Sequence, residues 1–436
     1  MTLEEKIDSG EVVVGIIGLG YVGLPLARAF AMKGIGVVGF DIDESKVTKL
    51  NRGESYLKTL PDEAVAQMRA KGTFEATADY DRLSECDAVI ICVPTPLTRM
   101  MEPDLSYVIA SSAEVAKRLR AGQLVTLEST TYPGTTDEVL KPLLEQGGLV
   151  CGRDFYLAYS PEREDPGNKQ FTTETIPKVV GGVDAVSGRI AAKLYGLVIQ
   201  TVVPVKGAKE AEAAKILENV YRSINIALVN ELKVIFDHMD IDVWEVIAAA
   251  GTKPFGFHRF TPGPGLGGHC IPIDPFYLAW KAREYGCHTR FIELAGEINT
   301  AMPRYVVDKV TEALNAHAKA VKGSRILVLG IAYKKDIDDL RESPALELIE
   351  LLQQRGAEVL YNDPYVPAIP RVRRHDLGLE STELTPELLR NVDCVLIATA
   401  HSVYDWQMIC TESSLVVDTR NATQDVTCGK EKVWQA

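Results

Sequence analysis

The chain has 436 residues, of which 46% are hydrophobic and 25% are charged, and its formal net charge is −13. This length allows two or three domains with sizeable cores, and the composition is ordinary for a globular protein. The acidic balance argues against general binding to nucleic acid or to a membrane surface, because such proteins present a basic face.

No apolar stretch is long enough to insert into a membrane, and the acidic N-terminus lacks the basic and apolar regions of a signal peptide. We therefore expect a cytoplasmic protein. The eight cysteines form no C-x-x-C pair, and the seven histidines show no spacing typical of metal ligands. Reduced thiols and no metal site are the corresponding expectations.

The first half of the chain alternates strand and helix patterns. Residues 12–17 form a continuous apolar run, which predicts a strand buried on both faces, and a helical pattern follows at 22–33. Further strands are predicted at 36–40, 88–93, 124–127 and 155–159, with helices at 105–119 and 135–145. This alternation predicts a doubly wound parallel sheet, and we assign it to an N-terminal Rossmann domain over residues 1–207.

A glycine pattern, Gly18-x-Gly20-x-x-Gly23, separates the first predicted strand from its helix. Such glycines allow a tight turn and close approach to a pyrophosphate, which then meets the helix N-terminus. Asp41 follows the second strand, where a carboxylate would bind ribose hydroxyls and repel a 2′-phosphate. The pattern therefore predicts NAD as the cofactor. The expected binding residues are Gly18, Gly20, Tyr21, Val22, Gly23 and Asp41, together with Pro94, Thr95 and Thr130 from loops after later strands.

One helical pattern without internal Pro or Gly covers residues 209–239, which corresponds to about 45 Å of helix. Its leftover apolar surface predicts a subunit contact, and so a homodimer or a higher homo-oligomer. Together with helices at 242–250, 275–285 and 289–317, it defines a central helical domain over residues 208–318.

A second alternating unit begins at Ser324 and lacks the full glycine fingerprint. Its predicted elements are strands at 325–329, 358–361, 394–399 and 415–418, and a helix at 343–355. We assign it to a C-terminal Rossmann-like domain over residues 319–436. The predicted fold class is therefore α/β, with two Rossmann-like doubly wound domains joined by a long central helix and a helical middle domain.

Cys270 follows a glycine-dense loop and precedes Asp274 by four positions. A thiolate can trap an aldehyde as a thiohemiacetal, and oxidation of that adduct gives a thioester and then an acid. A buried cysteine usually acts only as a small hydrophobic residue. The glycine loop and the predicted redox cofactor favour a nucleophile here.

Lys215 and Asn219 lie four residues apart on the long helix and so share one face, which avoids the apolar stripe. An ammonium and an amide aimed at one point can stabilise an oxyanion. An ordinary solvated helix face is the alternative.

Two carboxylates complete the candidate set. Asp274 would act as a base or orient a hydrolytic water, and its alternative role is to cap the helix that begins near Pro275. Glu162 follows a predicted strand and would hold water or substrate; its alternative is a loop carboxylate paired with Arg163.

Five patterns appear in order along the chain: the glycine fingerprint, Ser160–Arg163, Lys215-x-x-x-Asn219, Gly267–Cys270, and Lys334–Asp336 followed by Leu340–Ser343. In this order they resemble the UDP-glucose/GDP-mannose dehydrogenase family over nearly the whole chain. Within the family, the runs 159–167, 252–257 and 270–277 resemble bacterial UDP-N-acetyl-D-glucosamine 6-dehydrogenases. Ile273 stands where UDP-glucose dehydrogenases usually have Lys, which disfavours UDP-glucose.

The resemblance implies an NAD-dependent four-electron oxidation of the C6 hydroxyl of a UDP-N-acetylhexosamine to the uronic acid, through a thiohemiacetal and a thioester on Cys270. The first expected substrate is UDP-N-acetyl-D-glucosamine. UDP-N-acetylmannosamine, UDP-N-acetylgalactosamine and UDP-glucose are the alternatives. The product would serve surface-polysaccharide, O-antigen or lipopolysaccharide synthesis. A two-electron hydroxy-acid dehydrogenase and a nucleotide-sensing protein without turnover are rivals from outside this reaction.

The resemblance also implies substrate-binding roles. Tyr333 and Lys334 would flank the uridine and the diphosphate, and Arg420 would lie near the nucleotide. Gly267 would let the backbone approach the substrate without a clash. Arg341 would contact the cofactor side, and Arg259 would reach a substrate, including that of a neighbouring subunit.

Overall fold

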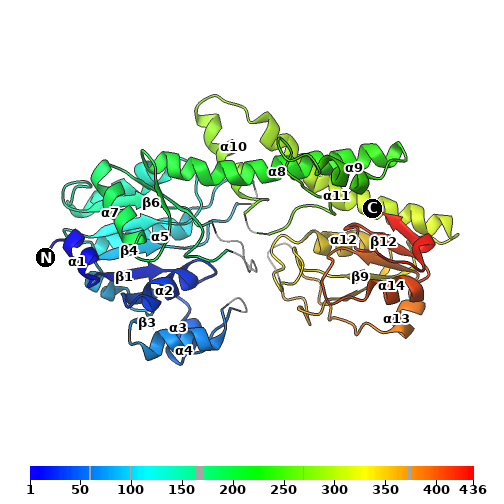
Figure 1. Ribbon diagram of the computed structural model, residues 1–436, viewed down its shortest axis with the longest axis horizontal. Coiled ribbons are helices and arrows are strands. Elements are labelled where there is room, and N and C mark those ends of the chain that lie inside the picture. Colours follow the sequence, from blue (N-terminus) through cyan, green and yellow to red (C-terminus); the bar gives the residue numbers. More distant parts are fainter. Residues whose placement is uncertain (58–59, 99, 164–170, 269, 372–374) are drawn as a thin grey trace. The chain divides into compact units, whose positions relative to one another are not determined.

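The computed structural model describes residues 1–436 apart from 58–59, 99, 164–170, 269 and 372–374 (Figure 1). His269 and part of the 159–167 run therefore lie outside the described residues. The chain divides into two compact units. Unit 1 contains residues 1–218 and 276–287, and unit 2 contains residues 219–275 and 288–436.

Unit 1 is built on an eight-stranded sheet in the order β3-β2-β1-β4-β5-β6-β7-β8. The strands are β1 (Val13–Ile17), β2 (Gly36–Phe40), β3 (Phe74–Thr77), β4 (Ala88–Ile91), β5 (Leu124–Leu127), β6 (Tyr156–Tyr159), β7 (Lys178–Gly182) and β8 (Val202–Pro204). All neighbours are parallel except β6 and β7. The order reverses between β1 and β4, and such a switch point creates a crevice at the carboxyl ends of the strands.

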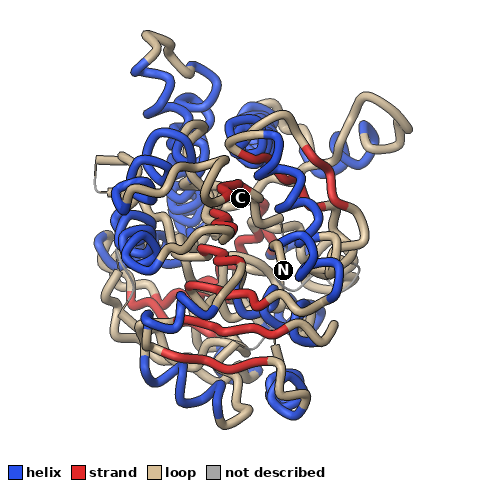
Figure 2. The backbone as a smooth tube through the Cα atoms, turned by 90° about the vertical axis from the view of Figure 1, so that its left-hand side faces the viewer, coloured by secondary structure: helices blue, strands red, loops and turns tan. Residues whose placement is uncertain are grey.

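Figure 2 shows strands of this sheet side by side, with helices beside them. The helices of unit 1 are α1 (Leu3–Ser9), α2 (Gly23–Met32), α3 (Glu44–Asn51), α4 (Asp62–Ala70), η1 (Tyr80–Glu85), α5 (Ser106–Arg118), η2 (Thr136–Leu140), α6 (Lys141–Leu144), η3 (Glu145–Gly147) and α7 (Ala185–Tyr195). Strand β1 lies in the core, with Val14, Ile16 and Ile17 at most 1% exposed. A strand covered on both faces needs such a continuous apolar run.

The helix predicted at 135–145 is divided into a π-helical turn, a short α-helix and a 3₁₀ turn. Pro142 lies in the first turn of α6. Because proline has no amide hydrogen, it cannot donate the bond that would continue a regular helix from the preceding turn. The sequence pattern therefore found the helical region but not its break.

The long helix α8 spans Ala208–His238, close to the predicted 209–239 (Figure 1). It begins in unit 1 and continues in unit 2, as its residues cross the division at 218. Helix α10 (Asp274–Glu284) also begins in unit 2, and its residues from 276 onward belong to unit 1. None of the helices among the described residues is long and apolar enough to cross a membrane.

Unit 2 contains a five-stranded parallel sheet in the order β10-β9-β11-β12-β13. Its strands are β9 (Arg325–Leu329), β10 (Glu358–Asn362), β11 (Cys394–Ile397), β12 (Val416–Asp418) and β13 (Val433–Gln435), and its helices are α9 (Val243–Ala250), α11 (Arg290–Ala316), α12 (Pro344–Gln354), α13 (Pro386–Arg390), α14 (Trp406–Glu412) and η4 (Lys430–Lys432). The predicted α/β class is confirmed, with a first sheet that is parallel except at the β6–β7 pair, a second sheet that is parallel throughout, and a long central helix.

Candidate active site

The glycine turn of unit 1 connects β1 to α2, as predicted. Gly18 has a φ of 91°, and a Cβ there would lie 2.6 Å from the carbonyl oxygen of Cys92. At Gly23 a Cβ would lie 1.9 Å from the carbonyl oxygen of Gly18, so a side chain would prevent the turn from closing. At Gly20, in contrast, no described heavy atom lies within 4 Å of the Cβ position. The turn thus leaves open space at Gly20, which fits the close approach of a pyrophosphate.

Asp41 is tied to this turn by backbone contacts. Its Oδ2 accepts a hydrogen bond from the amide of Leu19 at 3.2 Å, and its Oδ1 accepts one from the amide of Asp43 at 3.0 Å. Lys46 lies 3.7 Å away as an ion-pair partner. The carboxylate at the end of β2 therefore stands beside the glycine turn, which is the arrangement expected for holding an adenosine ribose. Tyr21 and Val22 lie in the same turn, partly exposed.

The loops after β4 and β5 are joined to each other. Ser129 Oγ donates a hydrogen bond to the carbonyl oxygen of Val93 at 2.7 Å. Tyr277 Oη of α10 donates a hydrogen bond to the carbonyl oxygen of Pro96 at 3.1 Å. Thr95 is buried, Pro94 is exposed, and Thr130 is partly buried. Parallel strands end at the same edge of a sheet, so these loops border the same crevice as the glycine turn.

Lys215 is buried and lies beside Glu162. Its side chain is 3% exposed, and Nζ lies 3.5 Å from Oε2 of Glu162. Arg163 pairs with Glu218 at 2.7 Å, and not with Glu162. Two alternatives from the sequence are therefore wrong: Lys215 is not on a solvated helix face, and Glu162 is not the partner of Arg163. The ion pair holds an ammonium and a carboxylate together in unit 1.

In unit 2, Asn219 and Asp274 are joined by a hydrogen bond. Asn219 Nδ2 donates to Oδ2 of Asp274 at 2.5 Å, and both residues are buried. Arg222 also bonds to the amide oxygen of Asn219. Asp274 is the first residue of α10, and its carboxylate engages Asn219, 55 positions earlier in the chain. The buried amide thus orients a carboxylate.

Cys270 lies one turn before that carboxylate. The amides of Ile273 and Asp274 donate hydrogen bonds to the carbonyl oxygen of Cys270, at 3.1 and 2.8 Å. The residue is partly exposed, and the eight cysteines, all of which lie among the described residues, form no disulfide with one another. The backbone of Cys270 is therefore bonded to that of Asp274, whose carboxylate is held by Asn219, and Cys270 is not fully buried.

The glycines before Cys270 let the loop pack on the aromatic ring of Tyr333. A Cβ at Gly267 would lie 2.5 Å from Cβ of Tyr333, and Gly268 has a φ of 88° with the ring 3.0 Å from its Cβ position. The amide of Gly268 donates to the carbonyl oxygen of Arg341 at 2.9 Å. The close approach at Gly267 is thus to Tyr333 of the same unit.

The cations expected to bind the nucleotide follow strands of the second sheet. Tyr333 and Lys334 lie in the loop after β9 and are partly exposed. Arg420 follows β12, donates from Nε to the carbonyl oxygen of Ala398 at 3.0 Å, and packs against Gly263. Burial lowers the pKa of Arg420 to about 10. Because β9 and β12 belong to one parallel sheet, both loops stand at the same edge.

Arg341 and Arg259 are placed differently. Arg341 forms an ion pair with Asp339 at 2.6 Å, and its side chain is 42% exposed. Arg259 is exposed, and its side chain approaches Gly251. Neither of these two contacts involves another predicted site residue.

Sequence reasoning missed a pair of polar residues that shape the loop carrying Tyr333 and Lys334 at the edge of the second sheet. Asp363 follows β10, and its Oδ2 accepts from the amide of Ile331 at 2.7 Å and lies 3.0 Å from Nε2 of His401. His401 Nδ1 in turn accepts from the amide of Asp336 at 2.9 Å. These bonds fix both ends of the loop that carries Tyr333 and Lys334. The available signal was the position of Asp363, directly after the second strand, as for Asp41.

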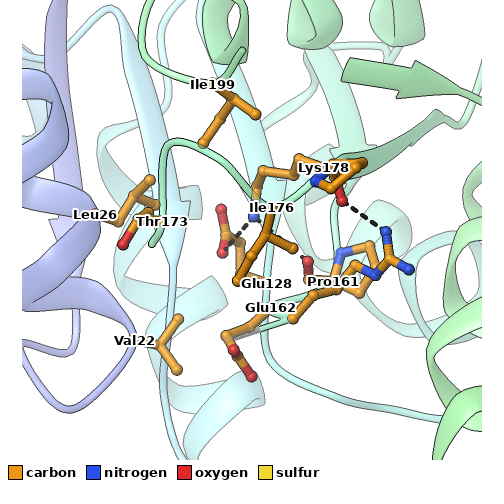
Figure 3. Close-up of a pocket in the computed structure, with 11 residues that line it drawn as sticks. Val22, Leu26, Glu128, Pro161, Glu162, Thr173, Ile176, Lys178 and Ile199 are labelled. Carbon is orange, nitrogen blue, oxygen red and sulfur yellow. Dashed lines mark hydrogen bonds and ion pairs between the residues drawn. The ribbon is translucent and has the colours of Figure 1, made fainter. Parts of the chain in front are cut away.

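The charged residues around Glu162 were also missed. A pocket of unit 1 is lined by residues that include Val22 and Leu26 of the cofactor turn and helix, and Glu128, Glu162 and Lys178 (Figure 3). Lys178 pairs with Glu128 at 3.0 Å. A charge beside a strand whose other residues are apolar was the signal that could have identified both residues.

One group of potential metal ligands occurs among the described residues. Glu347, Glu350 and His375 present ligand atoms within 4.8 Å of one another and are partly exposed. His375 Nδ1 lies 2.8 Å from Oε1 of Glu350.

Comparison with known proteins gives matches along most of the chain. Residues 12–199 match the NAD binding domain of the UDP-glucose/GDP-mannose dehydrogenase family, residues 209–301 match its central domain, and residues 327–425 match its UDP binding domain. The chain is 41% identical to protein CapL of Staphylococcus aureus over 394 residues, 90% of each protein. It is 37% identical to a UDP-N-acetyl-D-glucosamine 6-dehydrogenase of Pseudomonas aeruginosa, over 90% of this chain and 91% of that one.

Solved structures agree with these matches. The structure of a UDP-D-ManNAc dehydrogenase from Pyrococcus horikoshii superimposes with a TM-score of 0.87 at 33% identity, covering 96% of this chain and 97% of the other. A UDP-glucose dehydrogenase from Pyrobaculum islandicum superimposes with a TM-score of 0.83 at 28% identity, over 97% of this chain and 96% of that one.

Proposed function

Because the chain belongs to the UDP-glucose/GDP-mannose dehydrogenase family, as an NAD-dependent UDP-sugar dehydrogenase, we propose that it oxidises the C6 hydroxyl of a UDP-N-acetylhexosamine to the uronic acid. The observation that carries this proposal is the arrangement of Cys270, Asp274 and Asn219, in which a partly exposed cysteine precedes a buried, amide-bound carboxylate by one backbone turn. A simple alcohol dehydrogenase has no need of such a thiol.

The cofactor fits the turn of unit 1. The open space at Gly20 would receive the pyrophosphate, and Asp41 would bind the adenosine ribose. When bound, NAD accepts a hydride from the carbon that is oxidised. The residues of the chain must then hold the sugar, move its proton and stabilise negative charge on its oxygen.

The first oxidation converts the C6 alcohol to an aldehyde. We assign the hydroxyl proton to Asp274, whose carboxylate is held by Asn219 at 2.5 Å. The ammonium of Lys215 would stabilise the alkoxide as it forms, because a buried cation acts strongly on developing charge. Cys270 then adds through Sγ to the aldehyde, and the aldehyde oxygen becomes the hydroxyl of a thiohemiacetal.

The second oxidation removes a hydride from the thiohemiacetal carbon and a proton from its hydroxyl, which leaves a thioester on Cys270. Water attacks the thioester carbon, the bond to Sγ breaks, and the carboxylic acid leaves. Glu162 is the residue proposed to hold this water, since its carboxylate is anchored to Lys215 and lines a pocket. The net reaction reduces two NAD per sugar.

Several UDP-sugars are candidates for the substrate. Two relatives with comparable sequence identity are named for different epimers. The UDP-N-acetyl-D-glucosamine 6-dehydrogenase of Pseudomonas aeruginosa is 37% identical to this chain, and a UDP-N-acetyl-D-mannosamine dehydrogenase of Pyrococcus horikoshii is 35% identical. UDP-N-acetyl-D-glucosamine is the first substrate to test, and the mannosamine and galactosamine epimers and UDP-glucose are equal alternatives. We further propose a cytoplasmic enzyme whose product enters surface-polysaccharide synthesis.

The nucleotide is proposed to bind at the strand ends of the second sheet, through Tyr333, Lys334 and Arg420. The fixed loop ends at Asp363 and His401 support this assignment, because a diphosphate site needs pre-positioned donors. Roles for Arg341 and Arg259, and domain boundaries at 207 and 318, stay predictions.

A homodimer is proposed from the exposed apolar face of α8 in unit 2. Tyr221, Leu228 and Ile235 lie seven residues apart along this helix and Met239 directly follows its last residue; they are between 43% and 58% exposed. Such a stripe is typical of an interaction surface. In a Leu228→Glu variant we expect the mass measured by light scattering to halve. A wild-type protein that is monomeric at micromolar concentration would contradict the proposal.

The reaction is tested by counting NADH. Wild-type protein should release two NADH per UDP-sugar consumed, with the uronic acid identified as product. Cys270→Ser should abolish acid formation while NAD affinity changes by less than about twofold, because the glycine turn is untouched. One NADH per sugar, or substantial acid from the variant, would reject the mechanism.

A further inference from the structure

The segment that carries Glu162 is attached to β7 by side chains. Backbone pairing between β6 and β7 ends with Tyr159 opposite Gly181. Beyond that pair, Ser160 Oγ donates to the carbonyl oxygen of Val179 at 2.8 Å, and Lys178 Nζ donates to that of Pro161 at 3.4 Å. The antiparallel attachment therefore continues past the end of the strand, although Pro161 has no amide to donate.

A third attachment follows on the far side of Glu162. Arg163 Nη1 donates to the carbonyl oxygen of Pro177 at 2.6 Å, and its guanidinium pairs with Glu218 of α8. Residues on both sides of Glu162 are thus held by consecutive residues of 177–179. Glu162 itself turns to α8, where it meets Lys215.

Lys178 makes the central attachment, and the buried carboxylate of Glu128 holds its ammonium in place. Its Nζ lies 3.0 Å from Oε2 of Glu128, and Oε1 of the same carboxylate accepts a hydrogen bond from Tyr195 Oη at 2.6 Å. The side chains of Lys178 and Glu128 are 10% and 1% exposed, and Tyr195 is fully buried. Burial raises the pKa of Tyr195, which keeps its hydroxyl a donor. The ammonium is therefore fixed in place and its charge is balanced.

We propose that Lys178 is a positioning residue for Glu162: the ammonium, anchored by Glu128 and Tyr195, holds the Pro161 carbonyl and so keeps the Glu162 carboxylate against Lys215. The inference rests on the proposed function, because it takes Glu162 as the group that holds the hydrolytic water. It assigns a role in the reaction to three buried residues that do not touch the reacting atoms.

The test is a double-mutant cycle. Removing one member of a buried ion pair leaves an uncompensated charge, so Lys178→Met is combined with Glu128→Gln, which leaves no buried net charge and keeps an acceptor for Tyr195. The combined change is made in the wild type and in Glu162→Gln. Activity with UDP-sugar and NAD affinity are measured in all four proteins, after wild type has been shown to give two NADH per sugar.

In the wild-type background we expect kcat to fall about 10- to 100-fold, as for a catalytic group displaced by a fraction of an ångström to one ångström. KM and NAD affinity should stay within about twofold, since neither the glycine turn nor the second sheet is altered. In the Glu162→Gln background the same change should lower kcat no further, because its effect runs through Glu162. Lys178→Arg, which keeps the charge, should retain most of the activity.

Four results would overturn the inference. Equal losses of kcat in both backgrounds would show that Lys178 acts independently of Glu162. A loss of NAD affinity as large as the loss of kcat would show a collapsed pocket. A full two-NADH reaction in Glu162→Gln at wild-type kcat would remove the basis of the inference and leave the proposed function standing, whereas one NADH per sugar in wild type would defeat both. Lys193→Met is the control, because this lysine of α7 is 35% exposed and pairs with Asp8 at the surface.

Discussion

Replacing Lys233 with methionine should stabilise unit 2. Lys233 lies on α8, is 3% exposed, and has its ammonium 5.7 Å from the ring centre of Trp244. Burial is the main cause that lowers its pKa from 10.5 to about 8, against the attraction of Asp418, Asp237 and Asp242. The fold therefore disfavours the charged form that dominates at neutral pH.

The free-energy cost of keeping Lys233 charged in the folded state follows from this difference in pKa. At about 1.4 kcal/mol per pKa unit, holding Lys233 charged at pH 7 costs about 3 kcal/mol relative to the unfolded chain. Methionine fills a similar volume without charge but loses the cation–π contact, which is worth about 1 kcal/mol. The expected net gain is about 2 kcal/mol, or roughly 4–8 °C in the melting temperature of a unit of this size.

The stability difference between wild type and Lys233→Met should change with pH in a characteristic direction. Between pH 8 and 10.5 the unfolded chain keeps a proton on Lys233 that the folded chain has released, so wild-type stability gains from this group as pH rises. Below pH 8 both states are protonated and the penalty is constant. The advantage of Lys233→Met should therefore be largest below pH 8 and should shrink as pH approaches 10.5.

Urea unfolding followed by tryptophan fluorescence suits the measurement, because Trp244, Trp406 and Trp434 belong to unit 2 and only Trp280 to unit 1. Lys319→Met is the control, since that lysine is 45% exposed beside Asp393 and should matter by less than about 1 kcal/mol. A variant destabilised at pH 7, or an advantage that does not change up to pH 10.5, would refute the reasoning and would indicate that the ammonium has a favourable partner.

Three further changes address unit 1 and the second nucleotide edge. Gly20→Ala should leave the melting temperature within about 2 °C and weaken NAD binding at least tenfold, whereas Gly18→Ala should unfold unit 1, because Gly18, unlike Gly20, combines a positive φ with a backbone clash. Equal melting temperatures in the two variants would contradict this. Glu212 is buried and accepts hydrogen bonds from Gly134 and Thr136. Desolvation raises its pKa from 4.5 to about 7, so wild-type stability should fall by about 3 kcal/mol between pH 4.5 and 7, and Glu212→Gln should remove this slope in urea titrations. Asp363→Asn should destabilise unit 2 by about 3 kcal/mol and weaken UDP binding in calorimetry, and unchanged UDP affinity would argue against a site at this edge.

Much of the fold could be predicted from local patterns. Strand β1 was visible as an apolar run and α8 as an uninterrupted helical period, because burial on two faces and burial along one stripe leave different spacings in a sequence. Strands β3, β7, β8 and β13 were missed. Strand β7 reads Lys-Val-Val-Gly-Gly, so its apolar side chains are only those of Val179 and Val180, and β13 is three residues long.

The site residues could be predicted by type, but their partners could not. Lys215 and Asn219 stood out as polar residues off the apolar stripe, yet Lys215 meets Glu162 and Asn219 meets Asp274, which are 53 and 55 positions away. Periodicity reports which face of an element is buried. It does not report which buried polar groups meet, since that depends on how loops from separate strands close on the helix.

The second sheet shows how geometry can repeat without the full sequence pattern. Gly330 follows β9 with a φ of 73°, and a Cβ there would lie 2.2 Å from the carbonyl oxygen of Thr399, as Gly18 meets the carbonyl oxygen of Cys92 after β1. Asp363 binds the amide of Ile331 just as Asp41 binds that of Leu19. Both turns need one glycine at the crossing with the neighbouring strand and one carboxylate at the end of the second strand. In the first turn, Gly23 allows the turn to close and Gly20 leaves open space for a ligand. The second turn lacks these two glycines, which fits a different ligand at the same kind of edge.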